Sequence, residues 1–269
     1  MTISASMVKT LREKTGVGLM ACKQALSQAN GDLDKALDYL REKGLASASK
    51  KAERSANEGR IFVFQNANSA LILEINCETD FVASNTDFIN FASDLGNIIL
   101  EDSSILSLND LKNISIDGKS LDQLTADLIL KMGENIKINK FEKLISAKTI
   151  GHYVHSNAKI GSIVEFNQTV DQDLAKDIAM QVAAAKPKYL VPSEIPDEEK
   201  EKERQIIITQ LKEEGKPDEL VEKISNGKLS KFYKEICLLE QPFIKDDKKS
   251  IKQLVPKDSI TKFICYSLS

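Results

Sequence analysis

The segment that organises the chain is Leu71-Ile72-Leu73-Glu74-Ile75-Asn76-Cys77-Glu78-Thr79-Asp80-Phe81-Val82-Ala83-Ser84. Its apolar first half predicts a strand, and apolar side chains at three- and four-residue spacing over 88–99 predict an amphipathic helix. About four residues are enough to join a strand to a helix. The connection here is longer, and it carries the carboxylate of Asp80 beside the ring of Phe81. An aromatic residue in such a segment either packs into the core or anchors a partner.

A second copy of the same pattern favours the anchor. Residues 72–76 (Ile-Leu-Glu-Ile-Asn) align with residues 163–167 (Ile-Val-Glu-Phe-Asn), and each set lies in a predicted hairpin that precedes a helix. The helix cap comes about four residues after the asparagine in the second copy and about nine or ten in the first. The surplus is the segment Thr79-Asp80-Phe81-Val82. Because both copies share the scaffold, a segment that only one copy contains is a candidate for function.

Residues 1 to about 54 predict a compact three-helix unit. The first helix ends at Gly16, the second runs from about Gly18 to Ala29, and the third begins after Asp32 and ends at Gly44. A helix-prone, polar connector over residues 45–57 follows. So short a unit buries little apolar surface, and we expect it to be marginally stable unless it docks on something else.

The second helix has two predicted faces. The inward face is expected to hold Leu19, Cys22, Leu26 and Ala29, and the outer face Met20, Lys23, Gln24 and Ser27. Met20 is then either a stray exposed apolar residue or a contact for a partner, and both interpretations stay open. Arg12 is most simply a solvated helix residue, and His155 a solvated residue of the second hairpin.

The remaining pattern predicts an α+β fold with three parts. Residues 1–54 form the three-helix N-terminal domain with its connector. Residues 55–140 form a first core subdomain, which carries the Asp80-Phe81 segment. Residues 141–269 form a second, related core subdomain, and an antiparallel helical hairpin is inserted in it at about residues 190–236.

Composition excludes several classes of function. The net charge is −3, and only five of the 37 Lys and Arg residues are Arg, so we expect no direct binding of nucleic acid. No apolar run approaches membrane-spanning length, and the N-terminus has no signal-peptide pattern, so we expect no membrane contact. The scattered cysteines (Cys22, Cys77, Cys237 and Cys265) are expected to be reduced, mostly buried thiols of a cytoplasmic protein.

Motifs for catalysis are lacking in the sequence. It contains neither GxxxxGK[ST] nor GxGxxG. Its two histidines, His152 and His155, have an odd separation on a predicted strand, which points them to opposite faces and argues against a shared metal. A nucleophilic pair of Cys77 with His155 would exist only if the fold brought them together. We therefore predict no catalytic residues, no metal ligands, no cofactor and no enzymatic activity.

Two runs of residues carry a close resemblance to a known family. They are Leu11-Arg12-Glu13-Lys14-Thr15-Gly16-Val17-Gly18-Leu19-Met20-Ala21-Cys22-Lys23-Gln24-Ala25-Leu26 and Asn76-Cys77-Glu78-Thr79-Asp80-Phe81-Val82-Ala83. Both resemble signatures of bacterial elongation factor Ts, the family of guanine-nucleotide exchange factors for elongation factor Tu. The likeness extends over nearly the whole chain, through 133–136, Tyr153 and His155, 185–187 and 241–243.

The resemblance implies a fold and a function in translation (protein biosynthesis). The fold would be a ubiquitin-associated-like N-terminal domain and two related α+β subdomains with a protruding helical hairpin. The protein would bind elongation factor Tu in its GDP-bound and nucleotide-free forms, disturb its Mg²⁺ and phosphate site and promote GDP release.

The resemblance also implies which residues make contact. The Thr79–Val82 segment would enter the GTPase domain of elongation factor Tu, led by Asp80 and Phe81. Arg12, Leu19 and Met20 match the signature of the N-terminal domain, which docks on the same GTPase domain. His155 matches a contact residue of the family.

Two departures and two alternatives accompany the resemblance. Ala21 stands where the family usually has an acidic residue, so one polar contact near the second helix is expected to be missing. Longer members continue past the position of Ser269 into a C-terminal helical segment, whose contacts are expected to be absent.

The helical hairpin either joins two copies, as a homodimer or a 2:2 complex, or only contacts the partner. The alternative function is a non-exchanging helical adaptor, in which the N-terminal unit binds a partner helix and the core is scaffold.

Overall fold

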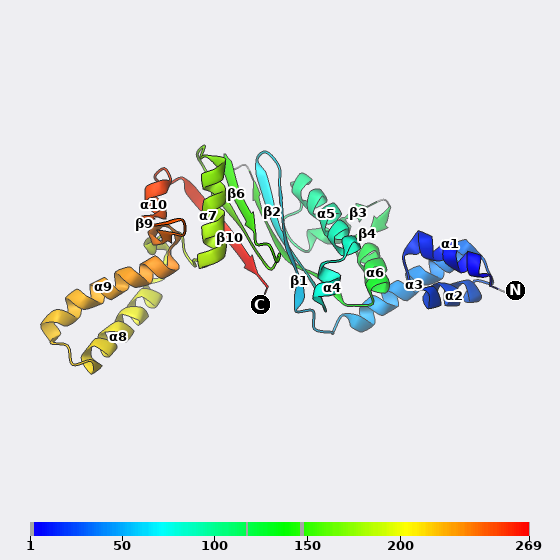
Figure 1. Cartoon of the computed structure of the whole chain (residues 1–269), viewed down its shortest axis with the longest axis horizontal. Helices are drawn as coiled ribbons and strands as arrows, with labels where there is room; N and C mark the ends of the chain where they lie inside the picture. Colours follow the sequence, from blue (N-terminus) through cyan, green and yellow to red (C-terminus); the bar gives the residue numbers. More distant parts are fainter. Residues whose placement is uncertain (1–2, 117, 146–147, 269) are drawn as a thin grey trace. The chain divides into compact units, whose positions relative to one another are not determined.

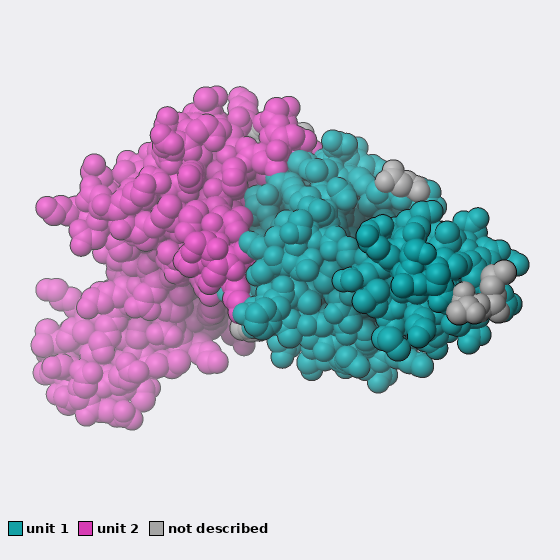
Figure 2. All heavy atoms as spheres, turned by 45° about the vertical axis from the view of Figure 1, so that its right-hand side comes forward, with its two compact units in different colours: residues 1–64, 71–143, 267–269 teal, residues 65–70, 144–266 magenta. Residues whose placement is uncertain are grey.

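The computed structural model describes residues 3–116, 118–145 and 148–268. The ends of the first and last predicted domains, residues 1–2 and 269, lie outside them. The chain divides into two compact units (Figure 2): the first comprises residues 1–64, 71–143 and 267–269, and the second comprises 65–70 and 144–266. The predicted α+β class is confirmed, because a helical N-terminal region precedes a core that contains sheets (Figure 1). The predicted division at residues 54 and 140 stays a prediction.

The N-terminal region consists of three helices, α1 (Ala5–Thr15), α2 (Leu19–Gln28) and α3 (Leu33–Lys51). Side-chain caps define two of their starts: the Ser4 hydroxyl accepts the N–H of Met7, and the Asp32 carboxylate accepts two N–H groups of the first turn of α3. Helix α1 ends at Gly16, whose φ of 68° is left-handed. The three helices bury a small apolar cluster that includes Leu11, Cys22, Ala25, Leu26, Ala36 and Leu40.

The expected end of the third helix at Gly44 was wrong. Helix α3 continues to Lys51 and so includes half of the predicted connector. Gly44 is buried, and a Cβ atom there would lie 3.3 Å from the carbonyl oxygen of Ala126, in α6 (Leu121–Met132). The glycine is therefore a close-packing residue rather than a helix stop, and it lets α3 lie directly against α6 within the first unit.

The first sheet has the strand order β1-β2-β5, formed by β1 (Glu58–Gln65), β2 (Ser69–Cys77) and β5 (Ile136–Ile145). Strand β2 is central and buried along almost its whole length. Helix α5 (Thr86–Glu101) and α6 contribute to the core that this sheet shares with them. Between these helices lie a 3₁₀ turn, η1 (Asp110–Asn113), and the short pair β3 (Ser115–Ile116) and β4 (Lys119–Ser120).

The second sheet repeats this topology with β6 (Thr149–Val154), β7 (Ile160–Phe166) and β10 (Ile260–Ser267), in the order β10-β7-β6. Strands β6 and β7 are antiparallel, and Gly151 is paired with Val164. Helix α7 (Gln172–Ala185) packs on this sheet and buries apolar side chains against it (Figure 1). Each copy thus consists of a hairpin, a helix and a third strand, and the third strand pairs with the second strand of the hairpin.

Side-chain contacts support the internal duplication. Glu74 on β2 accepts a hydrogen bond from Asn139 Nδ2 on β5 at 2.7 Å. The aligned Glu165 on β7 accepts one from Thr261 Oγ1 on β10 at 2.6 Å. The same position in each copy therefore links the central strand to its third strand.

The helical hairpin consists of α8 (Asp197–Glu213) and α9 (Asp218–Ile236), which lie side by side (Figure 1). Its own core is small and is formed by Ile207, Leu211 and Val221 with partly buried neighbours. The turns η2 (Pro192–Glu194) and η3 (Leu238–Glu240) flank the hairpin. The chain then forms β8 (Pro242–Phe243), β9 (Asp246–Ser250) and α10 (Ile251–Leu254) before β10. No helix in the described part of the chain has both the length and the apolarity to cross a membrane.

We expect Gly151→Ala to destabilise the second unit. A Cβ at Gly151 would collide with the backbone carbonyl of Ala175 in α7, so sheet and helix would have to separate. The expected loss is about 2–3 kcal/mol of unfolding free energy, measured by urea denaturation followed by circular dichroism. Gly227→Ala in α9 is the control, because nothing lies within 4 Å of a Cβ there; it should stabilise by about 0.5–1 kcal/mol. Equal effects of the two variants would contradict the close approach.

Candidate functional site

The connection between β2 and α5 contains a single helical turn, α4 (Asp80–Ala83), where the sequence suggested a loop. Thr79 is its N-cap, and its hydroxyl oxygen accepts the N–H of Val82 at 3.4 Å. The next helix, α5, begins after its own cap, Asn85, nine residues beyond Asn76. In the second copy the cap of α7 is Asp171, four residues beyond Asn167. The extra segment of the first copy is therefore an ordered turn.

Helix α4 has one buried and one exposed face. Val82 and Ala83 are buried and belong to the apolar core of the first unit. The Phe81 side chain is 84 % exposed, and Asp80 beside it is also exposed. A phenylalanine ring left in water forgoes roughly 2 kcal/mol of burial free energy, and exposed aromatic residues on ordered backbone are typical of interaction sites. Its role as an anchor stays a prediction.

Glu134 holds the start of α4. It follows Gly133, which ends α6 with a left-handed φ of 80°, and it precedes β5. Its Oε2 accepts the N–H groups of Glu78 and Thr79 at 3.1 and 3.0 Å, and its Oε1 accepts the hydroxyl of Thr79 at 2.6 Å. The sequence suggested no role for Glu134, because 55 residues separate it from Thr79. The family resemblance of residues 133–136 was the signal that could have drawn attention to it.

Cys77 is a buried structural thiol. Its Sγ donates to the carbonyl oxygen of Thr79 at 3.0 Å. Burial and, secondarily, the Glu134 carboxylate raise the pKa of Cys77 to about 12. A nucleophilic cysteine needs its thiolate form, which this environment disfavours. The predicted alternative of a Cys77–His155 pair therefore lacks an activated nucleophile.

The N-terminal candidates lie on two adjoining helices. Arg12 is exposed on α1, and Met20, near the start of α2, is 77 % exposed. The prediction that Leu19 faces inward was wrong, because its side chain is 51 % exposed. Leu19 is the first residue of α2, and burial starts one turn later at Cys22. Leu19 and Met20 thus form a small apolar face, which we call the α2 face.

His155 lies directly after β6, in the turn to β7, and is exposed. Its Nδ1 is 3.0 Å from Oδ1 of Asn157, so the turn itself orients the ring. The other histidine, His152, contacts Gln65 Oε1 through its Nδ1 at 2.7 Å. The structure thus places Thr79–Val82 in one turn and Arg12, Leu19 and Met20 on one helical pair of the first unit, and His155 in the second unit.

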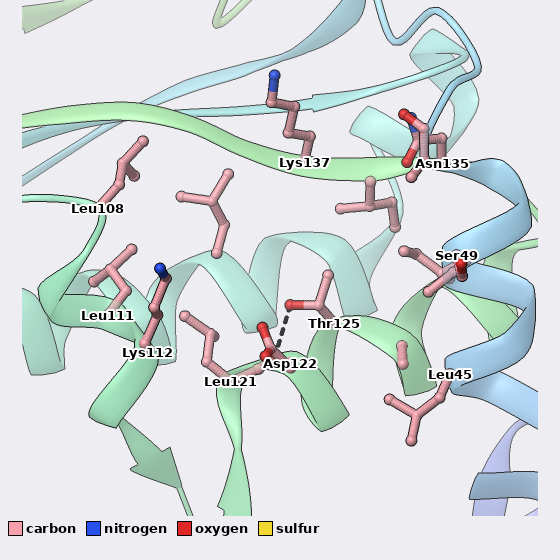
Figure 3. Close-up of a pocket in the computed structure, with 16 residues that line it drawn as sticks. Leu45, Ser49, Leu108, Leu111, Lys112, Leu121, Asp122, Thr125, Asn135 and Lys137 are labelled. Atoms are coloured by element: carbon pink, nitrogen blue, oxygen red, sulfur yellow. Dashed lines mark hydrogen bonds between the residues drawn. The ribbon is translucent and has the colours of Figure 1, made fainter. Parts of the chain in front are cut away.

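The first unit also contains a cavity of about 660 Å³ between α3, η1, α6 and β5 (Figure 3). Most of its lining is aliphatic, including Leu45, Leu111 and Leu121, with Lys112 and Asp122 among the polar residues. The lining residues that the structure describes include no His, Cys or Glu. Within residues 3–116, 118–145 and 148–268 no three acidic, His or Cys side chains are grouped to hold a metal ion. None of the candidate residues described above lines this cavity.

A comparison with protein-family models finds a match for most of the chain. The model of the family described as "Elongation factor TS" matches residues 78–269. The match begins at the base of α4, and it includes Phe81, Glu134 and His155 but not the N-terminal helices. It covers both sheets' third strands, the second hairpin and α8–α9, which is more than half of the chain. The chain belongs to the elongation factor Ts family.

Proposed function

We propose that this translation elongation factor acts as a guanine-nucleotide exchange factor, which binds elongation factor Tu with its GDP and promotes GDP release. The observation that carries the proposal is the Phe81 ring, which is 84 % exposed on a turn whose other face is buried in the core. The family supplies the role in translation. The exposed ring supplies a means of acting on a partner without covalent chemistry.

The proposed mechanism follows from how a GTPase holds GDP. Mg²⁺ demands near-ideal octahedral geometry and links the phosphates to the protein. Phe81 enters a pocket that opens only when the elements around the metal move, so the nucleotide loses part of its attraction. By linkage, this chain lowers the affinity of elongation factor Tu for GDP by the same factor by which GDP lowers its affinity for this chain. A coupling of about 4 kcal/mol corresponds to roughly a thousandfold change in affinity.

The neighbours of Phe81 have separate proposed roles. Asp80 is exposed at the first position of α4, so it brings a negative charge toward an anionic phosphate site. Thr79 caps the turn, and Val82 fixes it to the core. Arg12 and the α2 face dock on the same GTPase domain, and His155 adds a contact from the second unit.

An adaptor function is the second candidate, and the exposed α2 face favours it. In that case the N-terminal helices would capture a partner, and Phe81 would add affinity alone. The two functions differ in one measurable respect: an adaptor binds elongation factor Tu and leaves the rate of GDP loss unchanged.

We expect Phe81→Ala to slow GDP release from elongation factor Tu at least about tenfold, because the lost ring supplied the group that enters the pocket. The measurement is stopped-flow release of a fluorescent GDP analogue at saturating concentrations of this chain. The melting temperature should stay nearly unchanged, since an exposed ring contributes little to folding. Leu106→Ala is the matched control, because Leu106 is also an exposed apolar residue of the first unit, at 63 %. Release at the unaltered rate in Phe81→Ala would refute the proposal.

We expect Met20→Ala to act on binding instead. The α2 face is separate from α4 in sequence, so losing it should raise the half-saturating concentration several-fold, a typical effect of one interface side chain. The maximal release rate should change less than twofold. A titration of the same release assay separates the two parameters. A fall in maximal rate at constant half-saturation would contradict the docking role.

Cys77 should resist alkylation in the folded chain. Because its pKa is raised to about 12, its thiolate is scarce at pH 8. Iodoacetamide treatment followed by peptide mass spectrometry should leave Cys77 unmodified until the chain is denatured. GDP release should continue after the treatment. Modification of Cys77 in the folded chain would contradict its burial as a structural thiol.

A further inference from the structure

Two carboxylates exchange backbone hydrogen bonds at the base of α4. Glu134 accepts the N–H groups of Glu78 and Thr79, and in return the carboxylate of Glu78 accepts the N–H of Asn135 at 2.7 Å. Arg54 Nη1 is 3.5 Å from the same Glu78 oxygen. The segment before α4 and the corner between α6 and β5 are thereby joined in both directions.

We propose that Glu134 is a positioning residue for nucleotide exchange: it sets the direction in which α4 presents Phe81. The inference rests on the proposed function, because it assigns a task to a residue that supports the same site. Glu134 itself lies beside the backbone that precedes Phe81 and acts through Thr79.

The ring of Phe81 has little packing of its own to orient it. Being 84 % exposed, it takes its direction from the backbone of a four-residue helix. One isolated helical turn is unstable, since it fixes several dihedral angles for very few hydrogen bonds. Neighbouring structure must therefore fix α4. Val82 and Ala83 do so from the core side, and Thr79 does so at the start.

Thr79 is held at every polar atom. Its N–H and its hydroxyl proton are directed to the two oxygens of Glu134, and its carbonyl oxygen accepts the thiol of Cys77. Because the hydroxyl proton is committed to Glu134, the oxygen is left to accept the N–H of Val82. The carboxylate thus fixes the rotamer of the N-cap and, through it, the first turn of α4.

A second tie secures Glu134. Its neighbour Asn135 is 5 % exposed and donates from Nδ2 to the carbonyl oxygen of Arg54 at 2.8 Å. Ile136, which follows Asn135, and Ile129, whose carbonyl oxygen accepts the N–H of Gly133, are both buried in the core of the first unit. The corner that carries Glu134 is therefore rigid, as a positioning group requires.

Glu134→Gln is the principal test. The amide keeps the size of the side chain but offers an NH₂ group to one of the donors of Thr79 or Glu78, so that contact is lost. Small displacements of a positioned group lower rates strongly. We expect the maximal GDP release rate to fall about tenfold, with half-saturation changed less than about twofold. A variant that merely unfolds would lose active protein and melt earlier.

Asp110→Asn is the matched control. One oxygen of Asp110 accepts the N–H groups of Leu106 and Ser107 at 3.0 and 2.7 Å and the hydroxyl of Ser107 at 2.8 Å. It therefore has the same set of partners as Glu134, two N–H groups and one hydroxyl, in the same unit but away from α4 in sequence. We expect it to leave exchange unchanged.

Variants of Thr79 show whether Glu134 acts through the Thr79 hydroxyl. They also test the positioning role if Glu134→Gln folds poorly. Thr79→Val keeps the shape and removes both the hydroxyl contact with Glu134 and the acceptor for the Val82 N–H, so it should lose at least as much rate as Glu134→Gln. Thr79→Ser restores the hydroxyl and should recover most of that loss. The double variant should be no slower than Thr79→Val alone, because Glu134 acts through the hydroxyl that Thr79→Val already removes.

The outcomes separate this inference from the proposed function. If Phe81→Ala leaves GDP release unchanged, the proposed function fails. If Phe81→Ala slows release while Glu134→Gln and Thr79→Val match the unaltered chain, the positioning role is overturned and the function stands. Equal losses in Glu134→Gln and Asp110→Asn that follow their melting temperatures would also overturn it.

Discussion

The presentation of Phe81 depends on the burial of the residues that follow it. Val82 and Ala83 lie in the core of the first unit, and their burial forces the preceding ring of the same turn into water. A single helical turn would not persist without such support. The backbone of α4 is fixed from two sides. Val82 and Ala83 hold it in the core, and the Thr79 cap with the Glu134 carboxylate holds its start. An aromatic group that is ordered and exposed can enter a partner without first losing backbone freedom.

The internal duplication explains how the candidate site was singled out from the sequence. Both copies keep a hairpin, a helix and a third strand, and even the pair Glu74–Asn139 recurs as Glu165–Thr261. Strand alternation and helix spacing follow from local chemistry, so the hairpin and the following helix of each copy could be predicted. The extra turn with Phe81 was visible because the second copy lacks it. Its helical conformation was not visible, because four residues carry too little periodicity.

Features that depend on distant contacts could not be predicted. Gly44 resembles a helix stop in sequence, and only the approach of Ala126 shows that it is a packing residue. Leu19 has the spacing of an inward residue, yet it starts α2 before the core begins. The contacts of Glu134 join segments 55 residues apart, and no local pattern records them. Tertiary contacts thus decide the roles of Gly44 and Glu134, and the place where the core begins decides that of Leu19.

Burial of the ring sets a limit on what Phe81 can do alone. Transferring a phenylalanine side chain from water to a pocket contributes about 2–3 kcal/mol. That amount corresponds to a change of roughly 30- to 150-fold in affinity, which falls short of a thousandfold coupling. The remainder has to come from groups that also act only in the deformed state of the partner. We propose Asp80 as one such group, because it adjoins the ring and its carboxylate has the same negative charge as phosphate. Contacts at the α2 face that form equally in the deformed and undeformed states of the partner add nothing to this coupling, since equal binding to both states does not shift the equilibrium between them.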